Sequence, residues 1–432
     1  MKIKDGKNYD VLVIGAGSAG FCAAVQAARA GCRTALVETY TMPGGTLTVF
    51  GNTSIDAFFN PHRPKGDRRV IGGIAWEYVQ RLEQSGYASV PDPDMDFERT
   101  VQYGVRVDPI GAAACMDDLL LDAGVELYYG QPLADVDTEP SADGVRVTGA
   151  VISTKAGLVR LGAKILIDCS GDGDLCAWAG APFETAESLQ PGTMRLYIDT
   201  KGASFGDLAQ ADAAWKSLLQ NGTVQPENLF ADTFCVLLAQ DGNNTNHVSA
   251  LNAADNESRT RAEIRERRTL TRLIDTLHEA GDPIRIVGCA PQSGARESRR
   301  ILGDRIMTGS EYIRQTQYAD AVCYTYWYID IHQDNGLPTK HVYLHSEQTP
   351  TISLVALRPQ GLENVYMAGR CVSADRECAS AIRVKASCMA MGQAAGAAAA
   401  IGIKNGTART RDVSAQAVQE FLKANGAIVP NV

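Results

Sequence analysis

Near the N-terminus, an apolar run is followed by a run of small residues and then by a second apolar run. This order predicts a strand, a helix and a second strand. Residues 9–14 (YDVLVI) form an apolar, β-branched run, as expected of a buried parallel strand. Residues 21–30 are rich in alanine, which suits a helix packed closely on a sheet, and Gly31 ends that helix. Residues 34–37 form the second strand. The pattern predicts an α/β fold with a parallel sheet.

A glycine motif joins the first strand to the helix, and an acidic residue follows the second strand. Gly15 permits a tight turn, Gly17 lets the backbone approach a pyrophosphate, and Gly20 lets the helix lie against the strand. The helix N-terminus then faces the phosphates, while the acid accepts hydrogen bonds from ribose hydroxyls. The sequence therefore predicts a dinucleotide site made by Gly15, Ala16, Gly17, Ser18, Ala19, Gly20 and Glu38.

A second glycine turn at Gly44, Gly45 and Thr46 follows the acid, where a nicotinamide-dependent dehydrogenase usually continues with further βαβ units. This arrangement resembles the two-dinucleotide-type FAD-binding fold, in which the loop passes the pyrophosphate and the ribityl chain. The resemblance implies FAD as the cofactor.

Two later segments strengthen this resemblance. Apolar strands at 163–168 and 364–367 lead into turns that contain Gly171, Asp172, Gly369 and Arg370. A small-residue helix over 386–396 follows, and in such flavoproteins its N-terminus faces the flavin pyrimidine. The cofactor-binding residues expected there are Ala386, Ser387 and Cys388.

Six segments carry a wider resemblance: GAGSAG with Glu38, PGGTLT at 43–48, DCSGDGDLCAWAGAP at 168–182, ARESRRILGDRIMT at 295–308, DIH at 330–332, and the long stretch at 365–400. On these residues the chain resembles the FAD-dependent oxidoreductase family, and more distantly the flavoprotein subunits of fumarate reductases and heterodisulfide reductases. One departure is ADREC at 374–378, where family members often carry a His–Glu-like pair. No role is transferred to that segment.

The expected organisation is a Rossmann-like FAD-binding domain with an inserted α+β substrate or cap domain. We expect the FAD-binding domain to be discontinuous, at 1–60, 100–195 and 285–432, with an insertion at 61–100 and the cap at 196–284. Within these we expect an amphipathic helix near 73–85, a β-hairpin at 144–160 and a charged helix near 257–280.

Composition narrows the class of partner. The 432 residues include 41 Lys and Arg against 50 Asp and Glu, a net charge of −9, which disfavours nucleic acid and anionic membranes. The longest apolar stretch, residues 389–403, is shorter than the roughly 20 residues that span a bilayer, and indicates a packed helix rather than membrane insertion. Without an apolar signal segment at the N-terminus we expect a cytoplasmic protein.

Cysteine spacing and the number of glycine motifs indicate how electrons reach and leave the flavin. The 11 cysteines include no Cys-x-x-Cys pair, so neither a metal site nor a thiol relay is expected. No second G-x-G-x-x-G follows a strand, which argues against a separate NAD(P)H-binding domain. We therefore expect a small-molecule substrate and a separate electron acceptor or O2; a homo-oligomer is possible.

Histidines are the best candidates for proton transfer near neutral pH. The alternating stretch YWYIDIH places Asp330 and His332 on one face of a strand, where the carboxylate could orient the imidazole. His341 and His345 lie on the next strand, and pairing across the Asn-Gly turn at 335–336 would gather a histidine cluster. The alternative is that these are surface or satisfied core histidines.

Two arginines complete the catalytic candidates. Arg296, in the run RESRR, could clamp a carboxylate or stabilise an anionic flavin, although an interdomain ion-pair network is an equal alternative. Arg383 precedes the small-residue helix and could lie close to the flavin or substrate.

The leading hypothesis is an FAD-dependent dehydrogenase or oxidase of a polyol, sugar, hydroxy acid or amine, with His332, Asp330, His345, Arg296 and Arg383 as catalytic candidates. The alternatives are a flavin-dependent reductase of an activated C=C bond, a flavin monooxygenase, and an electron-transferring subunit that works only inside a complex.

Overall fold

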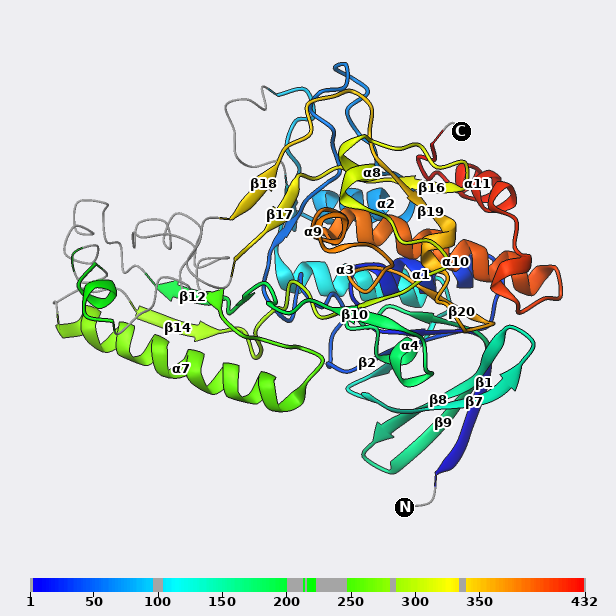
Figure 1. Ribbon diagram of the computed structural model, residues 1–432, viewed down its shortest axis with the longest axis horizontal. Helices are drawn as coiled ribbons and strands as arrows, with labels where there is room; N and C mark the ends of the chain where they lie inside the picture. Colours follow the sequence, from blue (N-terminus) through cyan, green and yellow to red (C-terminus); the bar gives the residue numbers. More distant parts are fainter. Residues whose placement is uncertain are drawn as a thin grey trace.

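The computed structural model describes residues 3–95, 104–199, 213, 216–222, 247–279, 285–333 and 339–430 (Figure 1). Its centre is a sheet in which five strands run parallel. They lie in the order β6 (Glu126–Tyr129), β2 (Thr34–Glu38), β1 (Lys4–Ile14), β9 (Gly157–Asp168) and β20 (Val365–Met367). The predicted α/β fold is confirmed.

The first half of β9 has a second role, because it also pairs with an antiparallel meander. β8 (Gly144–Thr154) pairs with this half of β9, and β7 (Leu133–Ser141) pairs with β8. The expected hairpin at 144–160 is therefore β8 with the start of β9, and β9 continues without a break into the strand expected at 163–168.

Alternate residues of β1 enter two different apolar cores. Val11 and Val13 belong to the large cluster that includes the buried faces of the helices, whereas Leu12 and Ile14 belong to a smaller cluster with α4 (Asp174–Trp178) and the meander. Both faces are buried over the last four residues of the strand, which explains why residues 11–14 (VLVI) are continuously apolar.

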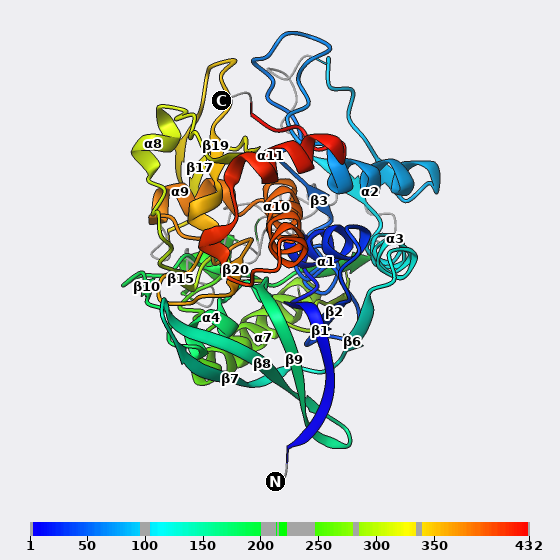
Figure 2. The same ribbon diagram turned by 90° about the vertical axis from the view of Figure 1, so that its right-hand side faces the viewer.

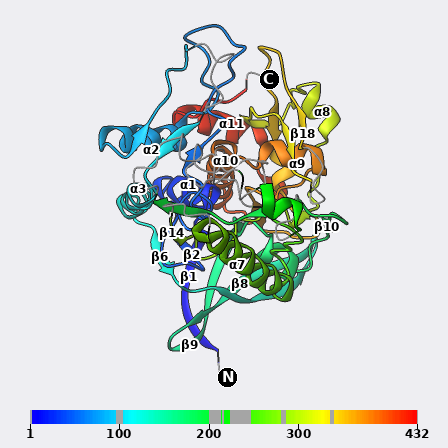
Figure 3. The same ribbon diagram turned by 90° about the vertical axis from the view of Figure 1, so that its left-hand side faces the viewer.

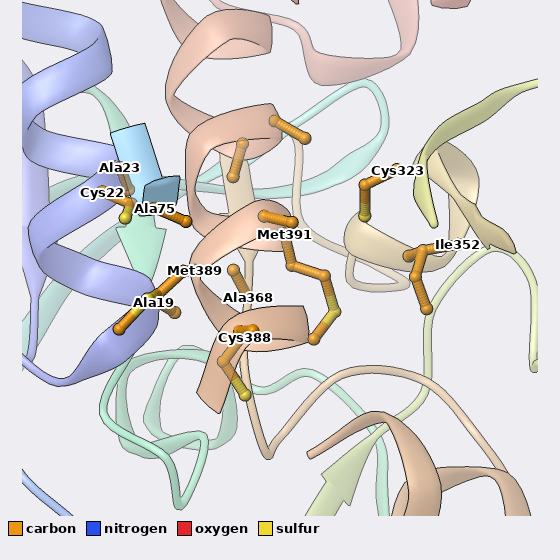
Figure 4. Close-up of a cluster of buried hydrophobic side chains, with 14 of the residues drawn as sticks. Ala19, Cys22, Ala23, Ala75, Cys323, Ile352, Ala368, Cys388, Met389 and Met391 are labelled. Atoms are coloured by element: carbon orange, nitrogen blue, oxygen red, sulfur yellow. The ribbon is translucent and has the colours of Figure 1, made fainter. Parts of the chain in front are cut away.

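The helices of one group lie on the side of the sheet opposite the meander (Figure 2). They are α1 (Ser18–Arg29), α2 (Gly73–Gln84), α3 (Pro109–Asp122), α10 (Lys385–Lys404) and α11 (Ala415–Ala424). α1 and α10 pack closely, with the small side chains of Ala19 and Ala23 on α1 and with Met389 on α10 in the shared core (Figure 4). The helix expected near 73–85 is α2, which packs on α10 and α3.

α10 is the one described helix that is long and apolar enough to cross a membrane. It has 20 residues and begins before the apolar stretch recognised in the sequence, and 89% of its most apolar window is buried inside the protein. A core helix has this burial.

The remaining elements flank the sheet. One group contains three antiparallel pairs and the long helix α7, which lies at the lower left of Figure 1 and faces the viewer in Figure 3. They are β10 (Phe183–Thr185) with β15 (Arg299–Ile301), β11 (Gly192–Thr193) with β13 (His247–Val248), β12 (Leu196–Asp199) with β14 (Arg285–Cys289), and α7 (Asn256–Glu279). Most of the expected cap between 200 and 246 lies outside the described residues, and β12–β14 joins segments on both sides of the boundary expected at 284.

A second group of short elements lies outside the seven-stranded sheet. It contains β16 (Ala321–Tyr324) with β19 (Thr351–Ser353), β17 (Ile329–Ile331) with β18 (Lys340–Val342), α8 (Gly309–Ile313), α9 (Arg376–Ile382) and the 3₁₀ turn Leu354–Leu357. The strands β3 (Ser54–Ile55), β4 (Ala88–Ser89) and β5 (Val105–Val107) form a small separate sheet, and a second 3₁₀ turn spans Thr410–Asp412.

The contact between α1 and α10 predicts the effect of one added methyl group. A Cβ at Gly392 would lie 2.0 Å from the carbonyl oxygen of Ala19, so Gly392→Ala must push the helices apart. We expect a loss of about 1–3 kcal/mol of stability, as for other overpacked cores, measured by chemical denaturation of the cofactor-loaded protein. The control is Gly288→Ala, where the nearest atom to the new methyl is an ordinary 3.5 Å away. Equal stability of the two variants would contradict this account.

Candidate active site and cofactor cavity

A continuous cavity of about 610 Å³ opens where the parallel strands end. Its wall is built from the residues that follow β1, β2, β9 and β20, together with the start of α10. Ligands of open parallel sheets bind at this edge. Of the residues expected at the cofactor, the wall includes Gly15, Gly17, Ser18, Ala19, Glu38, Gly45, Thr46, Gly171, Asp172, Gly369, Arg370 and Cys388.

Five other residues expected at the cofactor support the wall instead of forming it. The amide of Gly44 donates to the carbonyl of Ala16, and Gly20 packs against the backbone of Gly15. On α10, the amide of Ala386 donates to the carbonyl of Asp56. The hydroxyl of Ser387 bonds that of Thr325 at 2.7 Å. These residues face the protein interior behind the cavity wall, because only one side of a loop or helix can face a cavity.

The glycine loop leaves room for a phosphate. Gly15 has φ +95°, and a Cβ there would lie 2.4 Å from the carbonyl oxygen of Cys169, so only glycine fits the turn. A Cβ at Gly17 would meet no atom within 4 Å, and Gly17 lines the cavity. The backbone at the start of α1 is thus open to a ligand, as pyrophosphate binding requires.

Glu38 lies buried at the end of β2 and is held by the backbone. It accepts hydrogen bonds from the amides of Ala16 at 2.6 Å and Tyr40 at 2.9 Å. Burial raises the pKa of Glu38, and these backbone donors oppose the rise. The carboxylate therefore links the glycine loop to the second strand, in the position from which an acid reaches ribose hydroxyls.

A half-buried ion pair borders the middle of the cavity. Arg370 donates to Asp172 at 2.7 Å and to the hydroxyl of Ser298 at 2.9 Å, and that hydroxyl donates to Asp172 at 2.5 Å. Burial alone would raise the pKa of Asp172, but the charge of Arg370 and these hydrogen bonds hold it below its ordinary value. Arg259 of α7 approaches the same carboxylate at 3.7 Å.

The cavity continues to the N-terminus of α10, where the sequence analysis missed one residue. Lys385 is buried on the wall, its ammonium donates to the carbonyl of Ser54 at 2.6 Å, and burial lowers its pKa to about 8. Lys385 and Cys388 both line the cavity because residues three apart share one face of a helix. The open glycine loop, the acid of β2 and this helix end together fit FAD, which Gly17, Ser18, Glu38, Thr46 and Cys388 would hold.

The far end of the cavity carries the expected Asp–His pair. β17 pairs with β18 so that Asp330 lies opposite His341. Oδ1 of Asp330 is 3.4 Å from Nε2 of His332 and 3.2 Å from Nε2 of His341. Burial opposes ionisation of Asp330, but both imidazoles and the charge of Arg383 keep its pKa well below the usual range. The expected turn at 335–336 lies outside the described residues.

The environment of His332 keeps its imidazole neutral. Burial, and next the charge of Arg296, lower the pKa of His332 from 6.5 to about 4, although Asp330 acts in the opposite direction. His247, which the sequence analysis missed, stands with its ring centre 5.1 Å from that of His332. Within the described part of the chain, no group of three or more His, Cys, Asp or Glu side chains is arranged to hold a metal ion.

Gln190 positions this end of the cavity and was also missed. Its side-chain oxygen accepts from the backbone N–H of His332 at 3.1 Å and from Arg383 at 3.4 Å, while the backbone N–H of Gln190 donates to Glu297 at 2.6 Å. Glu297 in turn receives the guanidinium of Arg376 at 2.9 Å. Arg376, from the segment that departs from the family pattern, thus helps to position Gln190 through Glu297.

His345 is the expected catalytic residue that does not join the others. Its ring packs against those of His62 and Tyr343, and it is not on the cavity wall. β18 ends at Val342, so the strand alternation used to place His345 stops before reaching it. His341, not His345, is the partner of Asp330.

Comparisons with known proteins agree with a flavin site. A family model described as FAD dependent oxidoreductase matches residues 10–422. No curated protein sequence matches the chain. Among solved structures, a geranylgeranyl bacteriochlorophyll reductase-like protein from Thermoplasma acidophilum has 14% identity and a TM-score of 0.45, covering 97% of this chain and 83% of that one. p-Nitrophenol 4-monooxygenase from Pseudomonas putida has 13% identity and a TM-score of 0.44, covering 96% and 83%.

The position of Glu38 predicts its effect on cofactor affinity. Glu38→Gln removes the charge that orders the glycine loop and that would bind the ribose. We expect FAD to bind about 10- to 100-fold more weakly, since a hydrogen bond to a charged group contributes about 1.5–3 kcal/mol. The measurement is FAD fluorescence quenching on reconstitution of the apoprotein. Glu126→Gln, on the neighbouring strand β6 and outside the cavity wall, is the control, and an equal loss in both variants would contradict the assignment.

Proposed function

Because the chain belongs to the FAD dependent oxidoreductase family, we propose that this enzyme is a dehydrogenase or oxidase that takes a hydride from a small polar substrate. One observation carries the proposal: Asp330 and the buried His332 lie on the wall of the same cavity as the glycine loop. Bound FAD supplies the hydride acceptor in this family, so the chain itself has to supply binding, orientation and a base.

His332 is the base in this proposal. Removal of a hydride from a carbon that bears a hydroxyl or amine requires loss of the O–H or N–H proton. Asp330 faces Nε2 and favours a proton on that nitrogen, which places the basic lone pair of the ring on Nδ1. The lowered pKa of His332 keeps the imidazole unprotonated at neutral pH.

Gln190 and Arg383 position the pair. Gln190 holds the backbone of His332, and Arg383 donates to the carbonyl of Asp330 at 3.2 Å. The segment from 330 to 332 is therefore fixed at both of its ends by groups from other parts of the chain. Fixing the base in this way removes orientational freedom before the substrate arrives.

A reductase of an activated C=C bond is the second candidate, and the position of Arg296 favours it. This arginine lines the same cavity as His332, and burial, followed by the charge of Arg383, lowers its pKa. Reduction of a C=C bond requires a proton donor, and Arg296 would take that role. Reoxidation of the dithionite-reduced protein by enoates, without bleaching by any hydroxyl or amine donor, would favour this candidate over the dehydrogenase.

Substitution of His332 tests the proposed base. Polyols, sugars, hydroxy acids and amines are added anaerobically, and bleaching of the flavin band is followed by stopped flow. With a donor that bleaches the wild-type enzyme, His332→Ala should slow the reaction about 10²- to 10⁴-fold, the usual contribution of a general base. His345→Ala, whose ring lies outside the cavity wall, should keep the wild-type rate. A wild-type rate in His332→Ala would rule out this role.

The pH dependence gives a separate test of His332. A base acts in its unprotonated form, so kcat/KM, which reports the free enzyme, should stay level below neutrality and fall only as the pH drops through about 4. Arg296→Gln removes a charge that lowers the pKa of His332, and should move this fall toward pH 6.5. An acid limb near 6.5 in the wild-type enzyme, with FAD still bound, would contradict the proposal.

A further inference from the structure

A buried lysine lies on the cavity wall at the start of α10. Lys385 is 7% exposed and is the first residue of this helix. Moving an ammonium out of water is costly unless an anion compensates its charge. The N-terminus of a helix also carries a partial positive charge, so the first turn of a 20-residue helix disfavours a cation. The position of Lys385 therefore needs a physical reason.

The contacts of Lys385 orient its side chain without neutralising it. Nζ donates to the carbonyl of Ser54 at 2.6 Å, and this acceptor is uncharged. Asp56 is the carboxylate that favours the charged form of Lys385, but it accepts from the hydroxyl of Ser54 at 2.7 Å. Within the described part of the chain, Asp56 and Lys385 form no ion pair. An ammonium has three N–H donors, so Lys385 keeps capacity for a further acceptor in the cavity.

Burial makes the charge of Lys385 easy to change. It lowers the pKa of Lys385 from 10.5 to about 8. The charge of Arg383 acts in the same direction, whereas Asp56 and the thiol of Cys388 act in the opposite direction. A new charge placed beside this group would therefore decide, near physiological pH, whether it is an amine or an ammonium.

The cofactor can supply such a charge. The cavity runs without a break from the open glycine loop at Gly17, where the phosphates fit, to Lys385 at the start of α10. The family resemblance places the flavin pyrimidine at this helix end. Two-electron reduction by a hydride leaves the ring negatively charged, and protein charges beside the ring tune its electronic properties.

We propose that Lys385 couples reduction of the flavin to the uptake of one proton from solvent. The donor transfers a hydride, so the ring receives two electrons and one proton and becomes an anion. The amine of Lys385 then binds a proton from solvent, one N–H bond forms, and the new ammonium balances the charge of the ring. The inference goes beyond the proposed oxidation and does not depend on it, because any two-electron donor would produce the same anion.

The pH dependence of the reduction potential tests this coupling. The FAD-loaded enzyme is reduced with xanthine and xanthine oxidase beside a reference dye. From neutral pH to about 8 Lys385 is already charged, so we expect the slope of one proton per two electrons. Above about 8 the slope should rise to two protons, because an anionic ring raises the pKa of a neighbouring ammonium. A slope of one proton throughout would overturn the proposal.

Two substitutions separate the charge of Lys385 from its titration. Lys385→Met should lose the steeper slope. It should also bind sulfite about 10- to 100-fold more weakly, because sulfite makes the oxidised ring anionic and a charged hydrogen-bond partner is gone. Lys385→Arg keeps its charge to a much higher pH, so it should lose the steeper slope but bind sulfite nearly as the wild type does. Lys404→Met, at the exposed far end of α10, is the control and should keep both properties.

Other groups on the same wall give distinguishable results. Burial raises the pKa of Cys388 to about 12 and lowers that of His332 to about 4, so neither group changes its charge in this range. If Arg296 were the group that titrates, the steeper slope would persist in Lys385→Met and be lost in Arg296→Gln, which would overturn the assignment.

A role of Lys385 in substrate binding alone would leave the slope and the sulfite affinity unchanged in its variants, and this would also overturn the proposal. Failure of the proposed function gives a different result, because it would show as no bleaching by any donor while the wild type still shows the steeper slope above about pH 8.

Discussion

The packing of α1 against α10 joins the two ends of the chain, and the cavity exists because of it. Gly392 and Gly396 of α10 face the backbone of Ala19 and Ala23, so the helices approach more closely than any side chain would allow. Both helices begin at the cavity, α1 after the glycine loop and α10 at Lys385. Two positive helix ends thus face one space, which suits a cofactor that carries phosphates and gains negative charge on reduction.

Electrostatic cost explains the residues behind the site. A cavity with buried cations and neutral imidazoles is unfavourable unless its groups are fixed by hydrogen bonds. A series of hydrogen bonds runs from Arg376 through Glu297 to Gln190. Gln190 then bonds both the backbone of His332 and the guanidinium of Arg383. The ADREC segment, which departs from the family pattern, therefore has a structural role. Arg376 begins this series of hydrogen bonds, and Asp375 accepts from the backbone N–H of Cys378 at the start of α9.

Local signals predicted the sheet, the main helices and the glycine loop, because apolar period and turn chemistry act over a few residues. They also placed Asp330 and His332 on one face. The sequence analysis did not identify Gln190, His247 and Lys385 as site residues, because each reaches the site through contacts between distant segments. His345 was wrongly expected beside Asp330, because the sequence does not reveal that β18 ends at Val342. On α10 only Lys385 and Cys388 face the cavity. Which side of the helix faces the cavity depends on how α10 packs on α1, and the sequence does not show this.

The charges that hold His332 neutral also make it a weak base, and this sets a requirement on the substrate. A general base is most effective when its pKa lies near the working pH, whereas burial and Arg296 lower the pKa of His332 to about 4. The imidazole is then available as a base across the neutral pH range, but it holds each accepted proton weakly. In the proposed dehydrogenase, hydride loss from the substrate therefore has to supply most of the driving force for the proton transfer to His332.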